Sequence, residues 1–118
     1  MIADLPPMPT PPPIPIEVYL PRLAFDRISD ADVVAAARRL RYGGTLHWRA
    51  STNDLPAAVS ADSVRLSCMV GEAAVFVECF RALVDQASAE EDDALVIACA
   101  ETMARLFDAV ETAQKRQP

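Results

Sequence analysis

Apolar side chains recur at helical spacing through the second half of the chain. From Ser60 to about Val84 they return every three or four positions, and the opposite face of this segment is largely apolar as well. A second run, with one apolar stripe, extends from Ser88 to about Ala113. This periodicity predicts two long helices joined by a very short turn near residues 87–88, which is an antiparallel helical hairpin. The expected inner stripes are Leu66, Met69, Val70, Ala73, Phe76, Val77, Phe80, Leu83 and Val84, followed by Leu95, Val96, Cys99, Met103, Leu106, Phe107, Val110 and Ala113.

The ends of the second helix carry capping signals. Ser88 and Glu91 have the spacing of a capping box, in which the serine caps the first turn and the glutamate bonds back to it. Two aspartates follow in the first turns, and Lys115 with Arg116 lies at the other end, where the helix dipole favours cations. We therefore expect this helix to start at Ser88.

A shorter helix is predicted before the hairpin. Ser29 and Asp30 provide its N-terminal cap, and Gly43 with Gly44 provides a stop signal after the arginines of its last turn. Its expected inner stripe is Val33, Val34, Ala37 and Leu40. The following segment, TLHWRAS, alternates apolar and polar residues, which is typical of a strand or of an extended connection.

The N-terminal segment is rich in proline, with eight of the ten prolines between residues 5 and 21. Proline fixes φ and has no amide donor, so residues 1–22 are expected to be an extended arm that begins as polyproline II. Within it, the stretch from Ile14 to Leu20 carries several apolar side chains and is expected to lie against the long helices as a strap. Residues 23–118 are then expected to form a single helical domain.

The predicted fold class is mainly α, an antiparallel helical hairpin with one short helix and the extended arm. An α+β fold is the alternative, with a small sheet from residues 14–20, 45–51 and 64–70. The alternative rests on Val64, Leu66, Cys68 and Val70, which also alternate along the chain, and on Gly71, which could break the helical run so that a strand is followed by a shorter helix.

Composition limits the class of protein. The chain has a net charge of −6 and apolar residues make up 52%, which excludes a disordered chain and argues against general nucleic-acid binding. Its three cysteines are an odd number without paired spacing, so a disulfide framework is not expected. No signal peptide and no apolar run long enough for a membrane span are evident, and we expect a cytoplasmic protein.

Catalytic and metal-binding patterns are not evident in the sequence. The single histidine, His47, has no serine or cysteine nucleophile near it in sequence. Cysteine and histidine spacing does not match a metal site, and Glu72, Glu78 and Glu101 lack the Glu-x-x-His partners of a diiron bundle. We therefore expect a non-enzymatic protein with no catalytic residue, no cofactor and no metal.

Two charged groups are candidates for partner binding. An acidic run lies at the predicted hairpin tip, where it could imitate phosphates or could simply be a solvated helix start. A basic and aromatic segment lies after the short helix, where it could contact an acidic partner or could simply complement the helix end. The candidate residues are Glu90, Glu91, Asp92 and Asp93 in the first group, and Arg38, Arg39, Arg41, Trp48 and Arg49 in the second.

These features predict a small acidic protein–protein interaction module, an adaptor or an inhibitor of another macromolecule of the kind found on accessory or mobile elements. Because the first long helix is apolar nearly all round, we also expect a homodimer, in which two hairpins form a four-helix bundle. The alternative function is a nucleic-acid accessory factor that uses the segment from Arg38 to Arg49.

Overall fold

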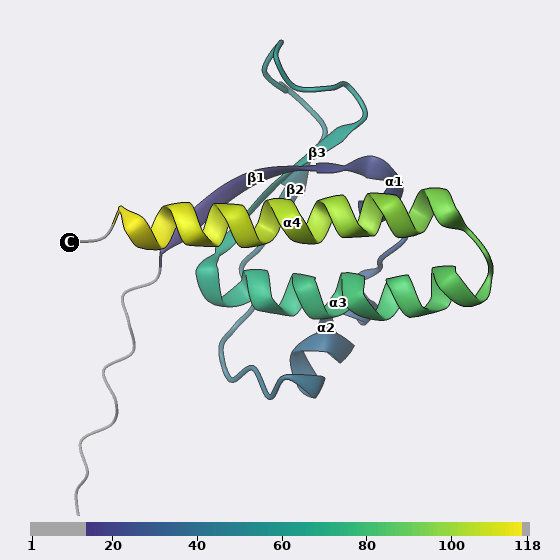
Figure 1. Cartoon of the computed structure of the whole chain (residues 1–118). Helices are drawn as coiled ribbons and strands as arrows, with labels where there is room; N and C mark the ends of the chain where they lie inside the picture. Colours follow the sequence, from purple (N-terminus) through teal and green to yellow (C-terminus); the bar gives the residue numbers. More distant parts are fainter. Residues whose placement is uncertain (1–13, 117–118) are drawn as a thin grey trace, which may run out of the picture.

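The computed structural model describes residues 14–116, in which helices cover one face of a three-stranded antiparallel sheet (Figure 1). The strand order is β1-β3-β2, so the strand formed last in the sequence lies in the centre. The elements are β1 (Pro15–Pro21), α1 (Arg22–Phe25), α2 (Asp30–Arg39), β2 (Arg49–Ser51), β3 (Ser63–Met69), α3 (Val70–Ala89) and α4 (Asp93–Lys115).

The fold is therefore α+β, and the prediction of a mainly α chain was wrong. Residues 63–69, which were assigned to the first long helix, form the central strand, and α3 starts only at Val70. The period of the apolar residues in this segment fits a strand as well as a helix. Pairing with residues 15–21 along the full length of β3 favours the strand, because it gives hydrogen-bond partners to backbone amides and carbonyls of both segments. The strands lie close to the three segments of the α+β alternative.

The prolines of β1 occupy positions where no amide donor is needed. The amide of Val70 donates to the carbonyl of Ile14 at 2.9 Å, so even-numbered residues of β1 face β3 and odd-numbered residues turn their backbone groups to the free edge. Pro15 and Pro21 are both odd-numbered, and each removes a donor from this edge. Such prolines protect an edge strand against pairing with another chain.

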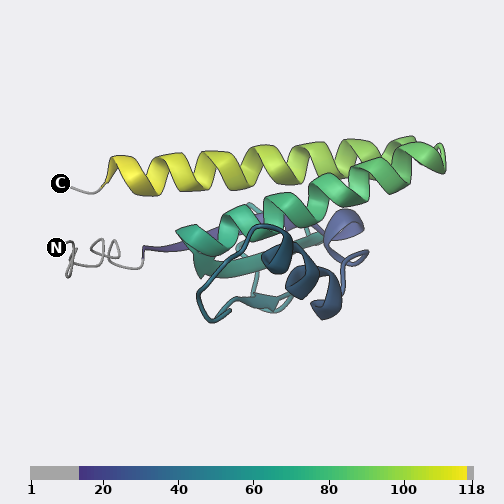
Figure 2. The same cartoon turned by 90° about the horizontal axis from the view of Figure 1, so that it is seen from below.

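Helices and sheet form successive layers. In Figure 2, α3 and α4 lie together on one side of the sheet, and α2 packs against α3. Strand β1 packs against α4. The extended segment that was expected to form a strap is thus a strand that is bonded to β3 and covered by α4. The core between the layers includes Ile16, Val18, Leu20, Leu66, Phe76, Phe80, Leu95, Cys99 and Leu106, all buried.

Three aromatic rings join distant parts of the chain. Trp48, from the segment before β2, meets the ring of Phe76 on α3 edge-on, with ring centroids 5.3 Å apart. Phe25 of α1 lies 6.3 Å from each of these rings. Phe76 is fully buried, whereas the other two rings are partly exposed. This aromatic cluster fixes α1 and the loop before β2 against the first half of α3.

The start of α2 was predicted correctly, but its end was not. Ser29 accepts the amide of Asp32 at 3.2 Å, and the carboxylate of Asp32 accepts the amide of Ser29 at 2.9 Å, which completes a capping box. The helix ends at Arg39, before the two glycines, and Arg41 takes the left-handed conformation with φ of 55°. Tyr42 donates its backbone amide to the carbonyl of Ala37, one of the last carbonyls of the helix. In most helix ends of this kind a glycine occupies the left-handed position that Arg41 occupies here.

The turn between the long helices lies later than predicted. Residues through Ala89 belong to α3, so Ser88 is inside that helix and does not cap α4. Asp92 is the cap, since its carboxylate accepts the amide of Leu95 at 3.2 Å. Glu91 has φ of 56° and occupies the left-handed position at the end of α3. The Ser88–Glu91 pattern therefore marks the end of one helix and not the start of the next.

Candidate functional site

Glu72 is the polar centre of the molecule, fully buried at the start of α3. Its Oε2 atom accepts the amides of His47 at 2.6 Å and of Trp48 at 3.0 Å, while its Oε1 atom accepts the amide of Met69 at 2.9 Å. A buried carboxylate is tolerated when its oxygens are hydrogen-bonded in this way. The side chain joins the loop before β2 to the junction of β3 and α3, so its role is to stabilise the fold. Neither of its oxygens faces solvent.

The three cysteines are free thiols, all buried. Burial raises the pKa of Cys68 to about 12, and the nearby charge of Glu72 adds to the shift. Burial also raises the pKa of Cys79 to about 11, and it raises the pKa of Cys99. Because the thiolate is the reactive form, these thiols are unsuited to nucleophilic chemistry at neutral pH. They behave as small core residues.

Glu78 on α3 accepts hydrogen bonds from two arginines. Arg81 donates to it through Nη2 at 2.6 Å and through Nε at 2.9 Å, and Arg39 of α2 donates through Nε at 3.1 Å. These hydrogen bonds, first from Arg81 and then from Arg39, lower the pKa of Glu78 to about 2. This Arg39–Glu78–Arg81 group fixes the end of α2 on α3.

The low pKa of Glu78 predicts that its contribution to stability depends on pH. The pKa is about 2 in the fold and 4.5 ordinarily, so the contribution is fully present above about pH 4.5 and disappears as the pH falls toward 2. We expect Glu78→Gln to lower the urea midpoint at neutral pH and to have a smaller effect at about pH 3, where part of the contribution of Glu78 is already lost. Asp85→Asn is the control, because Asp85 is a more exposed partner of Arg81. An equal deficit of Glu78→Gln at both pH values would contradict the prediction.

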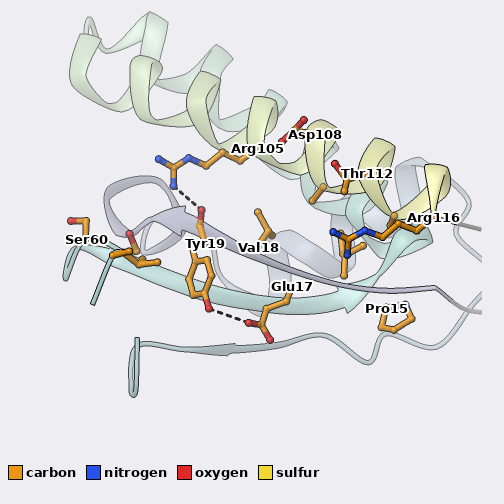
Figure 3. Close-up of a pocket in the computed structure, with 15 residues that line it drawn as sticks. Pro15, Glu17, Val18, Tyr19, Ser60, Arg105, Asp108, Thr112 and Arg116 are labelled. Carbon is orange, nitrogen blue, oxygen red and sulfur yellow. Dashed lines mark hydrogen bonds between the residues drawn. The ribbon is translucent and has the colours of Figure 1, made fainter. Parts of the chain in front are cut away.

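A groove of about 650 Å³ lies between β1 and the C-terminal half of α4 (Figure 3). Arg105 spans its wall, because its Nη1 atom donates to the carbonyl of Tyr19 at 2.8 Å, and the Tyr19 hydroxyl donates to Glu17 at 3.1 Å. Asp108 and Arg116 lie further along α4 on the same groove. Among the described residues, its lining contains no histidine and no cysteine, and its polar groups are hydroxyls, carboxylates and guanidinium groups.

Strand addition at this groove is restricted. Of the odd-numbered residues of β1, two are prolines without donors, and the carbonyl of Tyr19 is already bonded to Arg105. A peptide that added to β1 as a strand would lack both proline donors and would compete with Arg105 for the carbonyl of Tyr19. The groove is thus a protected sheet edge.

The four acidic residues at the tip differ in their positions and in their hydrogen-bond partners. Asp92 caps α4 and its carboxylate lies 3.9 Å from Arg27, while Glu90 accepts a hydrogen bond from Gln86. Glu91 is in the turn, and Asp93 is exposed in the first turn of α4. The four acids are close in sequence, yet only part of their charge is free for a partner.

The arginines of the second candidate group also differ in their surroundings. Arg39 is bonded to Glu78, Arg41 is exposed in the turn after α2, and Arg38 is exposed in the last turn of that helix. Arg49 is exposed on β2. The neutralisation of Arg39 weakens the basic character of this segment.

Trp48 belongs to the aromatic cluster described above, and its amide is bonded to Glu72. It is half-buried, and its ring packs edge-on against Phe76. This residue therefore anchors the loop before β2 on the core. Its neighbour His47 is exposed, and its backbone amide is bonded to the same carboxylate.

The most exposed large apolar side chains lie on α4. Ile97 is 67% exposed and Phe107 is 61% exposed. Ala100 and Ala104, also exposed, lie between them at spacings of three and four residues. Such spacing places all four on one stripe of the helix, here called the outer seam. Half-buried Val96, Met103 and Val110 follow the same helix alongside it at seven-residue spacing.

Sequence reasoning missed both Glu72 and the outer seam. Glu72 is three residues after Met69, so it has the spacing of a glutamate that bonds back to a helix start, and only the misplaced start of α3 hid this signal. Phe107 was assigned to the inner stripe, whereas the buried positions of α4 are Leu95, Ala98, Cys99, Thr102 and Leu106. Centring the stripe on these positions would have placed Ile97 and Phe107 outside.

Comparisons with known proteins do not assign a family. No protein-family model, curated protein or solved structure matches this chain. No helix among residues 14–116 is both long and apolar enough to cross a bilayer. In the same residues no three histidine, cysteine, aspartate or glutamate side chains are grouped as ligands for a metal ion.

Proposed function

We propose that this chain is a small non-enzymatic protein–protein interaction module, an adaptor or inhibitor that acts by binding another polypeptide through the outer seam. The observation that carries the proposal is the exposure of Ile97 and Phe107 on an uninterrupted apolar stripe of α4. Contiguous apolar surface of this kind on a small domain is characteristic of protein interfaces.

The polar groups of the domain support this choice over chemistry. Glu72 has its oxygens committed to backbone amides, and Glu78 is bonded to two arginines. The thiols are buried and protonated at neutral pH. The described lining of the groove along β1 contains no histidine or cysteine. These groups stabilise the fold and leave binding as the activity that its surface favours.

Nucleic-acid binding through Arg38–Arg49 is the weaker proposal. A net charge of −6 opposes approach to phosphates, and the guanidinium of Arg39 is already paired with Glu78. A reducing compartment such as the cytoplasm is in keeping with three unpaired thiols, and we include it in the proposal.

Affinity capture with matched surface variants tests the proposed function. Proteins from the native host are captured on the tagged chain, on Phe107→Glu and on Leu23→Glu, and are quantified by mass spectrometry. Leu23 is a suitable control because it is 52% exposed but lies on α1 and is not part of the outer seam. We expect Phe107→Glu to lose a partner that Leu23→Glu retains, since a charge in an apolar interface is costly to desolvate. Identical captured sets for the two variants would contradict the proposal.

A further inference from the structure

The outer seam has a symmetric order of side-chain sizes. Ile97 and Phe107 are large and lie at its two ends, while Ala100 and Ala104 are small and lie in its middle. Ten residues separate the ends, which is about 15 Å along the helix axis. The stripe therefore looks the same in either direction along α4, large–small–small–large, with its centre near residue 102.

Such a stripe is complementary to an antiparallel copy of itself. When two α4 helices meet face to face around a two-fold axis near residue 102, Ala100 lies opposite Ala104 of the other copy, and the helix backbones come close. Ile97 of each copy then lies opposite the other copy's Phe107, so the large side chains cover both flanks of the contact. Every exposed member of the outer seam gains an apolar neighbour in this arrangement.

Charges beside the outer seam favour the same pairing. Glu101 and Arg105 are exposed on the side of α4 that faces β1, and they are placed symmetrically about residue 103. In an antiparallel pair each Glu101 lies opposite the Arg105 of the other copy, and the reverse. Within one chain Arg105 already donates to the Tyr19 carbonyl through Nη1 and to Glu101 through Nη2, so the second copy places an identical Glu101–Arg105 pair beside this one.

The ends of α4 also select the antiparallel direction. Four acids at residues 90–93 precede or begin the helix, and Lys115 with Arg116 closes it. An antiparallel copy brings the basic end of one α4 toward the acidic end of the other, and it opposes the two helix dipoles. A parallel copy would place the two acidic tips together, which like-charge repulsion disfavours.

On the opposite side, α3 contributes an apolar margin. Val77 and Val84 are half-buried and are separated by two turns of α3, which is packed antiparallel to α4. Across the two-fold axis this margin faces the same margin of the other copy, so the two hairpins form a four-helix bundle.

We propose that two copies of this chain associate through the outer seam, with α4 antiparallel to α4 of the second copy about a two-fold axis near Ala100 and Ala104. This inference rests on the proposed function, because it names the partner that the same surface binds. The contact is a single helix seam with a narrow margin, so the dimer is expected to dissociate in the micromolar range.

Sedimentation equilibrium of the full chain tests the association. We expect a monomer–dimer equilibrium that Ala104→Arg weakens by at least about tenfold, because the arginine places bulk and charge where the helix backbones meet. Ala35→Arg is the matched control, as Ala35 is an exposed helical alanine on α2, and it should leave the equilibrium unchanged. Trp48 fluorescence checks that both variants are folded. A monomer at every concentration, or a dimer that Ala104→Arg leaves intact, would overturn the inference.

Cross-linking tests the direction of the pair. Ile97→Cys protein is mixed with Phe107→Cys protein and treated with a short bismaleimide, which the buried native thiols do not meet. We expect mixed cross-linked dimers and almost none from Ile97→Cys alone, because its two copies of residue 97 lie about 15 Å apart along the axis. Efficient cross-linking of Ile97→Cys with itself would overturn the antiparallel arrangement. A chain that stays monomeric yet captures a partner through Phe107 refutes self-association alone; a monomer that captures nothing refutes the proposed function as well.

Discussion

Phe76→Ala is expected to lower the free energy of unfolding by about 3–5 kcal/mol. The ring is fully buried, and it contacts both Trp48 and Phe25, whose ring centroids lie 5.3 and 6.3 Å away. Truncation removes apolar contact area and leaves a cavity that α3 cannot close, because the helix is held by its packing against α4 and α2. It also removes the surface on which the loop before β2 and α1 are fixed. Urea unfolding, followed by circular dichroism, measures the loss.

Leu23→Ala provides the control for Phe76→Ala. It too removes a large apolar side chain, but one that is 52% exposed on α1, so the change in unfolding free energy should stay within about 0.5 kcal/mol. A second readout is the Trp48 fluorescence of the folded state, which Phe76→Ala should alter and Leu23→Ala should leave close to that of the unmodified chain. Equal stability losses in the two variants would show that the aromatic cluster is not a centre of the core.

Glu72→Ala is expected to destabilise the fold to a similar extent, by about 3–5 kcal/mol, although it removes a polar side chain. The alanine leaves the amides of His47, Trp48 and Met69 without their acceptor at a buried site. Each buried donor without a partner costs about 1–3 kcal/mol, reduced where water reaches it. Chemical denaturation measures the effect, and hydrogen exchange at the three amides locates it.

Glu72→Gln separates the hydrogen bonds from the burial of the side chain. The amide keeps one oxygen as an acceptor and presents its NH₂ group to at least one amide donor, so an intermediate loss of about 1–3 kcal/mol is expected. Glu111→Ala is the surface control, because Glu111 is exposed and pairs only with Lys115 of the next turn. A Glu72→Ala variant as stable as Glu111→Ala would mean that the carboxylate is not needed to hold the loop.

Local signals in the sequence located the ends of some elements well and of others poorly. The predicted cap at Ser29 depends only on neighbouring residues, and the structure confirms it and adds the back-bonding carboxylate of Asp32. The Ser88–Glu91 pattern is equally local, yet α3 continues through Ser88 because its last turn packs on α4 through Ala87. A helix cap stabilises a helix by about 1 kcal/mol, and the burial of an apolar turn stabilises the fold by more than that.

The secondary structure of the segment from Ser63 to Met69 is not determined by its own sequence pattern. Its apolar residues fit both a strand and the first turns of a long helix, so the pattern alone left both possibilities open. Its partner in β1 lies about fifty residues earlier in the chain, and no local pattern reveals that pairing. The same applies to Glu72, whose three donors come from β3 and from a loop twenty-four or twenty-five residues away.

The sequence by itself determined that the chain folds around an apolar core, that two long helices follow one another closely, and that its thiols are unpaired core residues. Those properties depend on composition and on periodicity along one element, which are local. The tertiary structure alone decided that a sheet lies under the helices, that β1 turns its prolines to a free edge, and that α4 carries Ile97 and Phe107 on its outer side. A helix with apolar residues on much of its circumference can bury only the part that its neighbours cover, and the positions of those neighbours are set by the whole fold.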